Sequence, residues 1–109
     1  MNEKDILQKM RADDFVKNNG KVLRAINIGR PRYNRLESLR AALEPDIDRS
    51  QFADCINYLS EADYITLRRI GDKQPASISD DDICEIEAKV SAEGIRLLNG
   101  KTSDPCIRA

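Results

Sequence analysis

The chain contains no histidine, and its apolar residues form no long run. Because histidine is the commonest general base, its absence removes Ser–His and Cys–His nucleophile pairs and most zinc sites. Neither a phosphate-binding loop nor a Gly-x-Gly-x-x-Gly segment occurs. No apolar run approaches the ~20 residues of a membrane-spanning helix, and the charged start of the chain lacks a signal peptide's apolar region. The sequence therefore predicts a cytoplasmic protein that is not an enzyme and uses no cofactor.

Cysteine is scarce, and its spacing fits neither a disulfide framework nor a metal site. Cys55, Cys84 and Cys106 are odd in number, far apart and not in a Cys-x-x-Cys pair. We therefore expect reduced structural thiols. Residues 80–82 are three consecutive aspartates, but consecutive side chains point in different directions and no pattern of calcium ligands follows. We interpret this run as a solvated acidic surface.

Acidic and basic residues nearly balance over the whole chain, but they are segregated along it. The net charge of −1 argues against strong non-specific binding to nucleic acid, because such binding neutralises phosphates. Residues 17–40 nevertheless hold seven basic residues and one acid. Residues 44–63 hold six acids and one arginine, and residues 72–87 hold six acids and one lysine. The first half of the chain is therefore basic and the second half acidic.

The N-terminal residues are predicted to be helical. Residues 2–17 carry a thin apolar face of Ile6, Leu7 and Met10, which must pack on something to be stable. That partner is either the rest of the domain or a second copy of the chain. Residues 18–20, Asn-Asn-Gly, either end the helix or lie within it, since glycine costs ~1 kcal/mol there relative to alanine.

Two capping signals predict the starts of the next helices. Asn34 and Glu37 are three residues apart, as in a capping box, and open a helix that stops before Pro45. Asp48 and Gln51 repeat this spacing at the start of a third helix. The face of the third helix predicted to be buried carries Phe52, Cys55, Ile56, Leu59 and Ala62.

Alternating apolar residues then predict two strands, residues 63–70 and 83–90, joined by a loop of twelve residues. Ser91 is expected to cap a short final helix that Gly100 ends. Helix, strand, loop and strand behind two shorter helices is the order of a winged helix-turn-helix. We therefore predict an α+β protein of 109 residues with one modest core. Its winged-helix domain of three helices and a β-hairpin wing spans residues 20–100, after a helical extension (1–19) and before a tail (101–109).

In this fold the third helix can lie in a groove of DNA, while the preceding helix crosses the phosphate backbone. The arginines at 30–40 are the candidate phosphate contacts, and the third helix offers groups for base edges or phosphates. Asp54 lies on the exposed face of the third helix and would repel phosphate. The loop between the strands contains only one basic residue, Lys73. The candidate DNA-binding residues are Arg30, Arg32, Arg35, Arg40, Arg49, Ser50 and Asn57.

Four segments resemble a family of small winged-helix proteins encoded in phages and Mu-like prophages. They are residues 48–51 (Asp-Arg-Ser-Gln), 59–67, 90–100 and the ending 104–107 (Asp-Pro-Cys-Ile). The pattern Leu-x-Glu-x-x-Tyr-Ile and the helix opening Val-Ser-Ala-Glu-Gly are also similar to winged-helix transcription regulators. The family resemblance implies the fold and a phage origin but no activity. Together with the arginines at 30–40, it leads us to predict a phage or prophage protein of the transcription-regulator type that binds double-stranded DNA, as a monomer or a homodimer. The alternative is a module of the same fold that binds a phage or host protein and no DNA.

Overall fold

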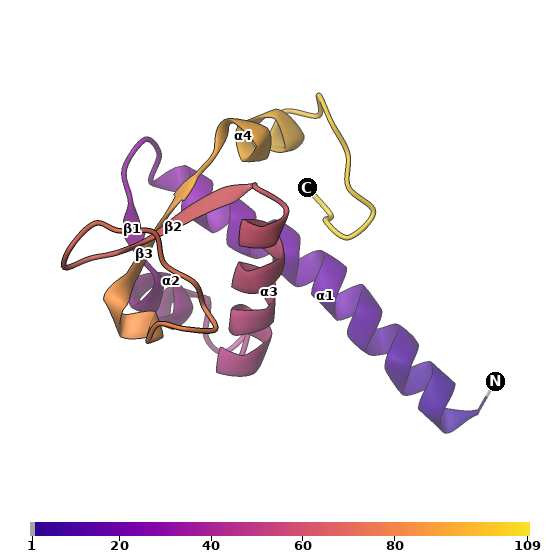
Figure 1. Ribbon diagram of the computed structural model, residues 1–109. Coiled ribbons are helices and arrows are strands. Elements are labelled where there is room, and N and C mark those ends of the chain that lie inside the picture. Colours follow the sequence, from indigo (N-terminus) through magenta and orange to yellow (C-terminus); the bar gives the residue numbers. More distant parts are fainter. Residues whose placement is uncertain (1) are drawn as a thin grey trace.

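The computed structural model describes residues 2–109. Its longest element is α1 (Glu3–Ile28), one helix of 26 residues that crosses the molecule and projects beyond it at the N-terminal end (Figure 1). Asn2 caps the helix, because its side chain accepts a hydrogen bond from the backbone N–H of Asp5. Residues 18–20 lie within the helix and do not end it.

Two further helices complete the three-helix part of the core. α2 (Leu36–Leu43) and α3 (Arg49–Glu61) follow α1, and the Asp48–Gln51 capping box of α3 is confirmed, with reciprocal bonds of 2.8 and 3.0 Å. The predicted box at Asn34 is wrong, because Arg35 occupies the cap position of α2 and no side chain caps the helix. Asn34 instead belongs to a strand.

The buried face of α3 is confirmed: Phe52, Cys55, Ile56 and Leu59 are fully buried, and Ala62 is partly buried. These side chains form one core with α1, through Val22, Leu23 and Ile26, and with the inner face of the sheet.

Three antiparallel strands form the sheet in the order β1-β3-β2. β2 (Ile65–Arg69) and β3 (Ile86–Val90) confirm the two predicted strands, but both are shorter than the predicted 63–70 and 83–90. Ile83–Glu85 form a 3-10 turn, η1, because the side chain of Asp82 accepts a bond from Cys84 and starts the turn. β1 (Asn34–Arg35) was not predicted, since two residues are too short to show alternation.

The segment between β2 and β3 is largely attached to the domain. After a short turn at residues 71–73 the chain returns along β2. The Gln74 carbonyl accepts a hydrogen bond from the Arg69 N–H, and the Ala76 N–H donates to the Leu67 carbonyl. The side chain of Asp81 accepts from the backbone N–H of Ser77 and lies 3.8 Å from the Arg69 guanidinium. Two of the three consecutive aspartates, Asp81 and Asp82, thus hold local turns, and this part of the chain is not a free acidic loop.

α4 (Ala92–Leu98) is the predicted final helix, capped by the Ser91 hydroxyl and followed by Gly100 at φ +73°. The four helices and three strands of residues 2–109 form an α+β fold compatible with a winged helix. Within these residues, no helix is long and apolar enough to cross a membrane.

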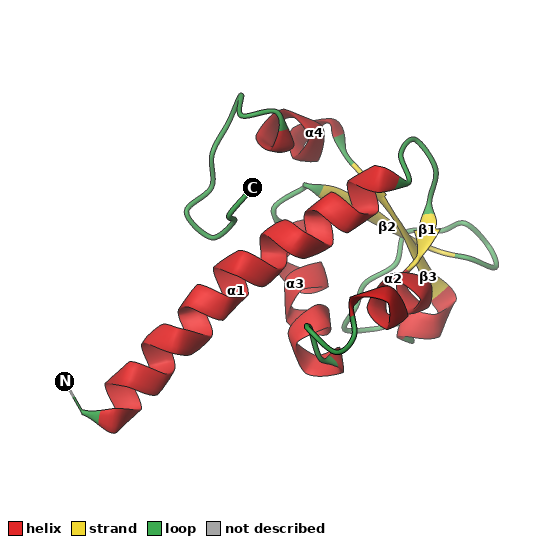
Figure 2. Ribbon diagram, turned by 180° about the vertical axis from the view of Figure 1, so that it is seen from behind, coloured by secondary structure: helices red, strands yellow, loops and turns green. Residues whose placement is uncertain are grey.

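The end of the chain docks against the middle of α1 (Figure 2). Ile107 is buried, and the side chain of Asn19 donates to the carbonyl of Cys106 at 2.9 Å. The Arg108 N–H donates to the Val16 carbonyl at 3.1 Å. A Cβ on Gly20 would lie 1.9 Å from the Arg108 carbonyl oxygen. The glycine therefore serves close backbone approach and does not interrupt the helix.

Asp104 attaches the same C-terminal segment to α3 and to the residue just before β2. Its carboxylate accepts hydrogen bonds from the hydroxyls of Tyr58 and Tyr64 and from the Cys106 N–H, all at 2.7–2.9 Å. Burial alone would raise the pKa of Asp104, but these three donors outweigh it and the pKa is lowered.

Asp104 should therefore make the stability depend on pH. A carboxyl whose pKa is lowered on folding stabilises the protein above its unfolded pKa, ~3.9, and loses that effect as the pH falls through the folded value. In urea unfolding, the stability difference between the wild type and Asp104→Asn should be largest above about pH 5 and shrink below about pH 4. Asp46→Asn, at an exposed position, is the matched control. A stability difference between the wild type and Asp104→Asn that does not change with pH would contradict the stabilising role of the ionised Asp104 carboxylate.

Candidate nucleic-acid interface

The exposed face of α3 carries three predicted DNA-binding residues, Arg49, Ser50 and Asn57, and all three are exposed. Asp54 and Glu61 are exposed on the same helix. This strip is also flanked on both sides by other parts of the chain. Because acids interrupt it and neighbours border it, the face is a poor match for the phosphates that line a DNA groove.

Two grooves define those flanks. On one side a groove of about 300 Å³ separates α3 from the projecting part of α1 and is lined by Arg11, Asp14, Phe15, Asn18, Ser50, Gln51, Asp54 and Cys55. On the other side Asn57 lines a groove with Ala76 and Ser77 of the segment that returns along β2.

Arg40 is committed to contacts inside its own helix. Its guanidinium donates to the carboxylates of Glu37 and Glu44, and its side chain is only 11% exposed. The hydrogen bond with Glu37 is the main reason why the pKa of Arg40 is raised. The charge of this predicted phosphate contact is therefore already balanced.

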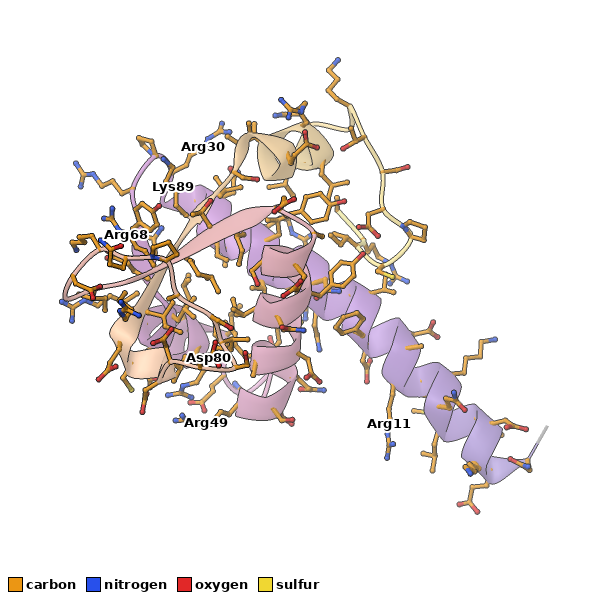
Figure 3. The ribbon with its side chains drawn as sticks, in the orientation of Figure 1. Arg11, Arg30, Arg49, Arg68, Asp80 and Lys89 are labelled. Carbon is orange, nitrogen blue, oxygen red and sulfur yellow. The ribbon has the colours of Figure 1, made fainter. Side chains whose placement is uncertain are left out.

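The remaining predicted arginines lie at the sheet. Arg35 is in β1, and Arg30 and Arg32 lie in the turn between α1 and β1. Arg30 and Arg49 lie on opposite sides of the globular part, whereas Arg30, Arg68 and Lys89 lie on the same side (Figure 3). The structure thus separates the predicted residues into a sheet group and an α3 group.

The strand register explains why cations meet on the outer face of the sheet. Leu67 of β2 and Ala88 of β3 pair and point to the core, so their neighbours point outward. Arg35 and Arg68 both pair with Glu87, one on each side of the central strand. We call the resulting group the basic sheet surface; it comprises Arg30, Arg32, Arg35, Arg68, Lys73 and Lys89.

A buried carboxylate holds two of these cations in place. Glu87 is 8% exposed and accepts hydrogen bonds from Arg68 at 2.7 Å and Lys73 at 3.0 Å. Burial raises the pKa of Glu87, but the bonds from the two cations outweigh it and the pKa is lowered. The carboxylate lies deeper than its two partners, whose side chains are 31% and 52% exposed, so the cations of these pairs face solvent more than Glu87 does.

Tyr33 sits among the same cations. The Arg68 guanidinium lies 3.6 Å from the centre of the Tyr33 ring, and the Lys89 ammonium lies 5.7 Å from it. A cation over an aromatic ring is attracted by the partial negative charge of the ring face. Tyr33 therefore orients the side chains of Arg68 and Lys89. The basic sheet surface is therefore ordered by contacts within the protein.

Sequence reasoning missed Arg68 and Lys89 because both lie in the acidic half of the chain. The strand pattern placed Arg68 and Lys89 on the polar side, and that was the available signal. The pattern could not show that β1 brings Arg35 onto the same face, since the register between β1 and β3 joins residues more than fifty positions apart.

The described residues offer little for other chemistry. Across residues 2–109, no group of three histidine, cysteine or acidic side chains is arranged to hold a metal ion. The three cysteines are free, and burial raises the pKa of Cys55 to about 12, so this thiol stays protonated and unreactive. No protein-family model matches the chain, and no curated protein matches it.

Proposed function

We propose that this winged-helix-like protein binds double-stranded DNA through the basic sheet surface. The observation that carries the proposal is the meeting of cations from separate segments around Tyr33, with Glu87 as the buried carboxylate among them. Arginine and lysine that neutralise phosphates supply most of the affinity of non-specific DNA binding. The resemblance to phage and prophage regulators extends the proposal to control of transcription.

In this mode the sheet, and not α3, meets the DNA backbone. A helix in the major groove is flanked by phosphates, and the acids of α3, Asp54 foremost, oppose that placement. Arg49, at the start of α3, contributes only if the DNA extends beyond the sheet. The proposal therefore predicts phosphate contacts that position the DNA and little reading of base sequence.

The test is a titration of duplex DNA at two or more salt concentrations. Four cations of the basic sheet surface have no carboxylate partner among the described residues: Arg30, Arg32, Arg35 and Lys89. Since each neutralised phosphate contributes ~0.9, the slope of log affinity against log salt should be about −4. Arg35→Ala or Lys89→Ala should weaken binding to all sequences alike and reduce the slope by about one unit.

Two control variants locate the binding face. Lys101→Ala removes the same charge from an exposed residue outside the surface and should leave affinity nearly unchanged. Asp54→Asn should raise affinity only if α3 meets the groove, because it removes a negative charge from that helix. A rise with Asp54→Asn, combined with no effect of Lys89→Ala, would move the interface from the sheet to α3.

The second candidate function is a protein-interaction module. It is favoured by the acids exposed around α3, with Asp54 and Glu61 on the helix and Asp80 on the segment after β2. Such a face suits a basic protein partner of phage or host origin. If duplex binding is undetectable at low salt, or unaffected by Arg35→Ala and Lys89→Ala, this second function replaces DNA binding.

A further inference from the structure

Half of α1 extends beyond the domain that the rest of the chain forms. Every residue from 2 to 14 is exposed, and Figure 2 shows the N-terminal end of the helix projecting from the body. Ile6, Leu7 and Met10 are 47%, 48% and 57% exposed. A helix as short as the projecting half of α1 is marginal in water by itself. Its stability therefore depends on packing against another surface.

The solvent-facing side of α1 has a regular pattern of charge. Glu3, Leu7, Met10 and Asp14 follow one another at steps of four and three residues, and all are exposed. Lys17, Lys21 and Arg24 continue the same steps in the second half of the helix, where Lys21 is half-buried and Arg24 donates to the Arg108 carbonyl. Alternate steps of four and three residues place side chains along one seam of a helix that pairs with another helix. The seam is therefore acidic and apolar in its first half and basic in its second.

We propose that α1 pairs antiparallel with α1 of a second copy of the chain along this seam. Antiparallel pairing centred between Asp14 and Lys17 places the acidic half of each helix against the basic half of the other. Asp14 then lies opposite Lys17 of the second copy, and Met10 lies opposite Lys21. Leu7 and Met10 cover the aliphatic stems of Arg24 and Lys21.

Charge complementarity selects a second copy as the occupant. Each helix carries an acidic half and a basic half. In a pair related by a two-fold axis across the seam, the acidic half of each helix contacts the basic half of the other, so the same favourable contact is made twice. A parallel pair would instead set acids against acids and bases against bases, which is unfavourable. The core side chains of α1 (Val22, Leu23 and Ile26) lie on the opposite side, so pairing leaves the domain core intact.

The dimer should be weak and sensitive to salt. A 26-residue helix is about 39 Å long, but only three large apolar side chains are exposed on its projecting half. This apolar area is well below the roughly 800 Å² per partner of a stable interface. Exposed ion pairs supply the orientation, and salt screens them.

A charge-swap experiment with the full chain tests the pairing. The first variant, Glu3→Lys with Asp14→Lys, makes the seam basic, and the second, Lys17→Glu with Lys21→Glu, makes it acidic. In sedimentation equilibrium at low salt, the wild type should dimerise, and each variant alone should be monomeric. An equimolar mixture of the two variants should dimerise again, because a basic seam then meets an acidic one.

Lys4→Glu with Lys9→Glu is the matched control. It makes the same charge change as the second variant at exposed positions outside the seam, so the dimer should survive. Circular dichroism should show the same helix content for all variants, since none of the altered residues belongs to the buried core. A wild type that stays monomeric at low salt, variants that still dimerise alone, a mixture that stays monomeric, or loss of the dimer in the control would each overturn the proposal.

Discussion

Gly20→Ala is expected to destabilise the protein by about 2 kcal/mol or more, although alanine is the better helix former by ~1 kcal/mol. The added methyl would lie 1.9 Å from the Arg108 carbonyl oxygen, so the tail must leave its site on α1. Leaving exposes Ile107, whose burial is worth about 1.5–3 kcal/mol. It also breaks the Asn19–Cys106 and Arg108–Val16 hydrogen bonds, at about 0.5–1.5 kcal/mol each. The lost contacts therefore exceed the gain in helix propensity.

Urea unfolding measures this change, and Gly71→Ala is its control. A Cβ on Gly71 would meet nothing within 4 Å, so that variant should stay within about 0.5 kcal/mol of the wild type. Combining Gly20→Ala with Ile107→Ala should cost little more than the larger single effect, because both act on the same docked tail. Stabilisation by Gly20→Ala would show that the tail does not lie against α1.

Leu59→Ala should destabilise the protein by roughly 2–5 kcal/mol, because it leaves a cavity in the core. Leu59 is fully buried at the end of α3, where its carbonyl accepts a hydrogen bond from Tyr64 just before β2. The close packing of helix and sheet at this point leaves little room to collapse around the cavity.

Chemical denaturation of Leu59→Ala should be compared with Asn57→Ala, on the exposed side of the same helix. The control keeps the helix and its cap, so its effect should remain within about 0.5 kcal/mol. A loss below ~1 kcal/mol for Leu59→Ala would mean that the buried face of α3 is assigned wrongly.

Signals confined to a few residues were sufficient for much of the fold. The Asp48 cap, the Ser91 cap and the turn at Gly100 are local, and the structure confirms all three. The alternation that predicted β2 and β3 depends only on which residues face the core. Such signals work because a cap or a period is completed within one or two turns of chain.

The failures occurred where a local signal competed with a distant partner. Asn34 has the right residue type and spacing for a cap, but β3 recruits it into β1, where it pairs with Ala88. The interpretation of residues 18–20 stayed open because the reason for Gly20 is Arg108, near the other end of the chain. The residues of the candidate site were likewise predicted only where a local signal was sufficient. The arginines were found from composition, whereas the pairing of Arg40 and the addition of Arg68, Lys73 and Lys89 required side-chain positions.

The sequence by itself determined helices α2, α3 and α4, the positions of β2 and β3, the apolar face of α3 and that basic charge gathers early in the chain. Tertiary structure alone decided which cations share a surface, because the register of β1 and β2 on β3 brings Arg35 and Arg68 to either side of Glu87. It also decided that the tail belongs to the core, since the hydrogen bonds of Asp104 join residues 40 and 46 positions apart and Ile107 packs into the same core. Caps and periodicities arise from neighbours along the chain, but register and docking arise from burying surfaces that only folding brings together.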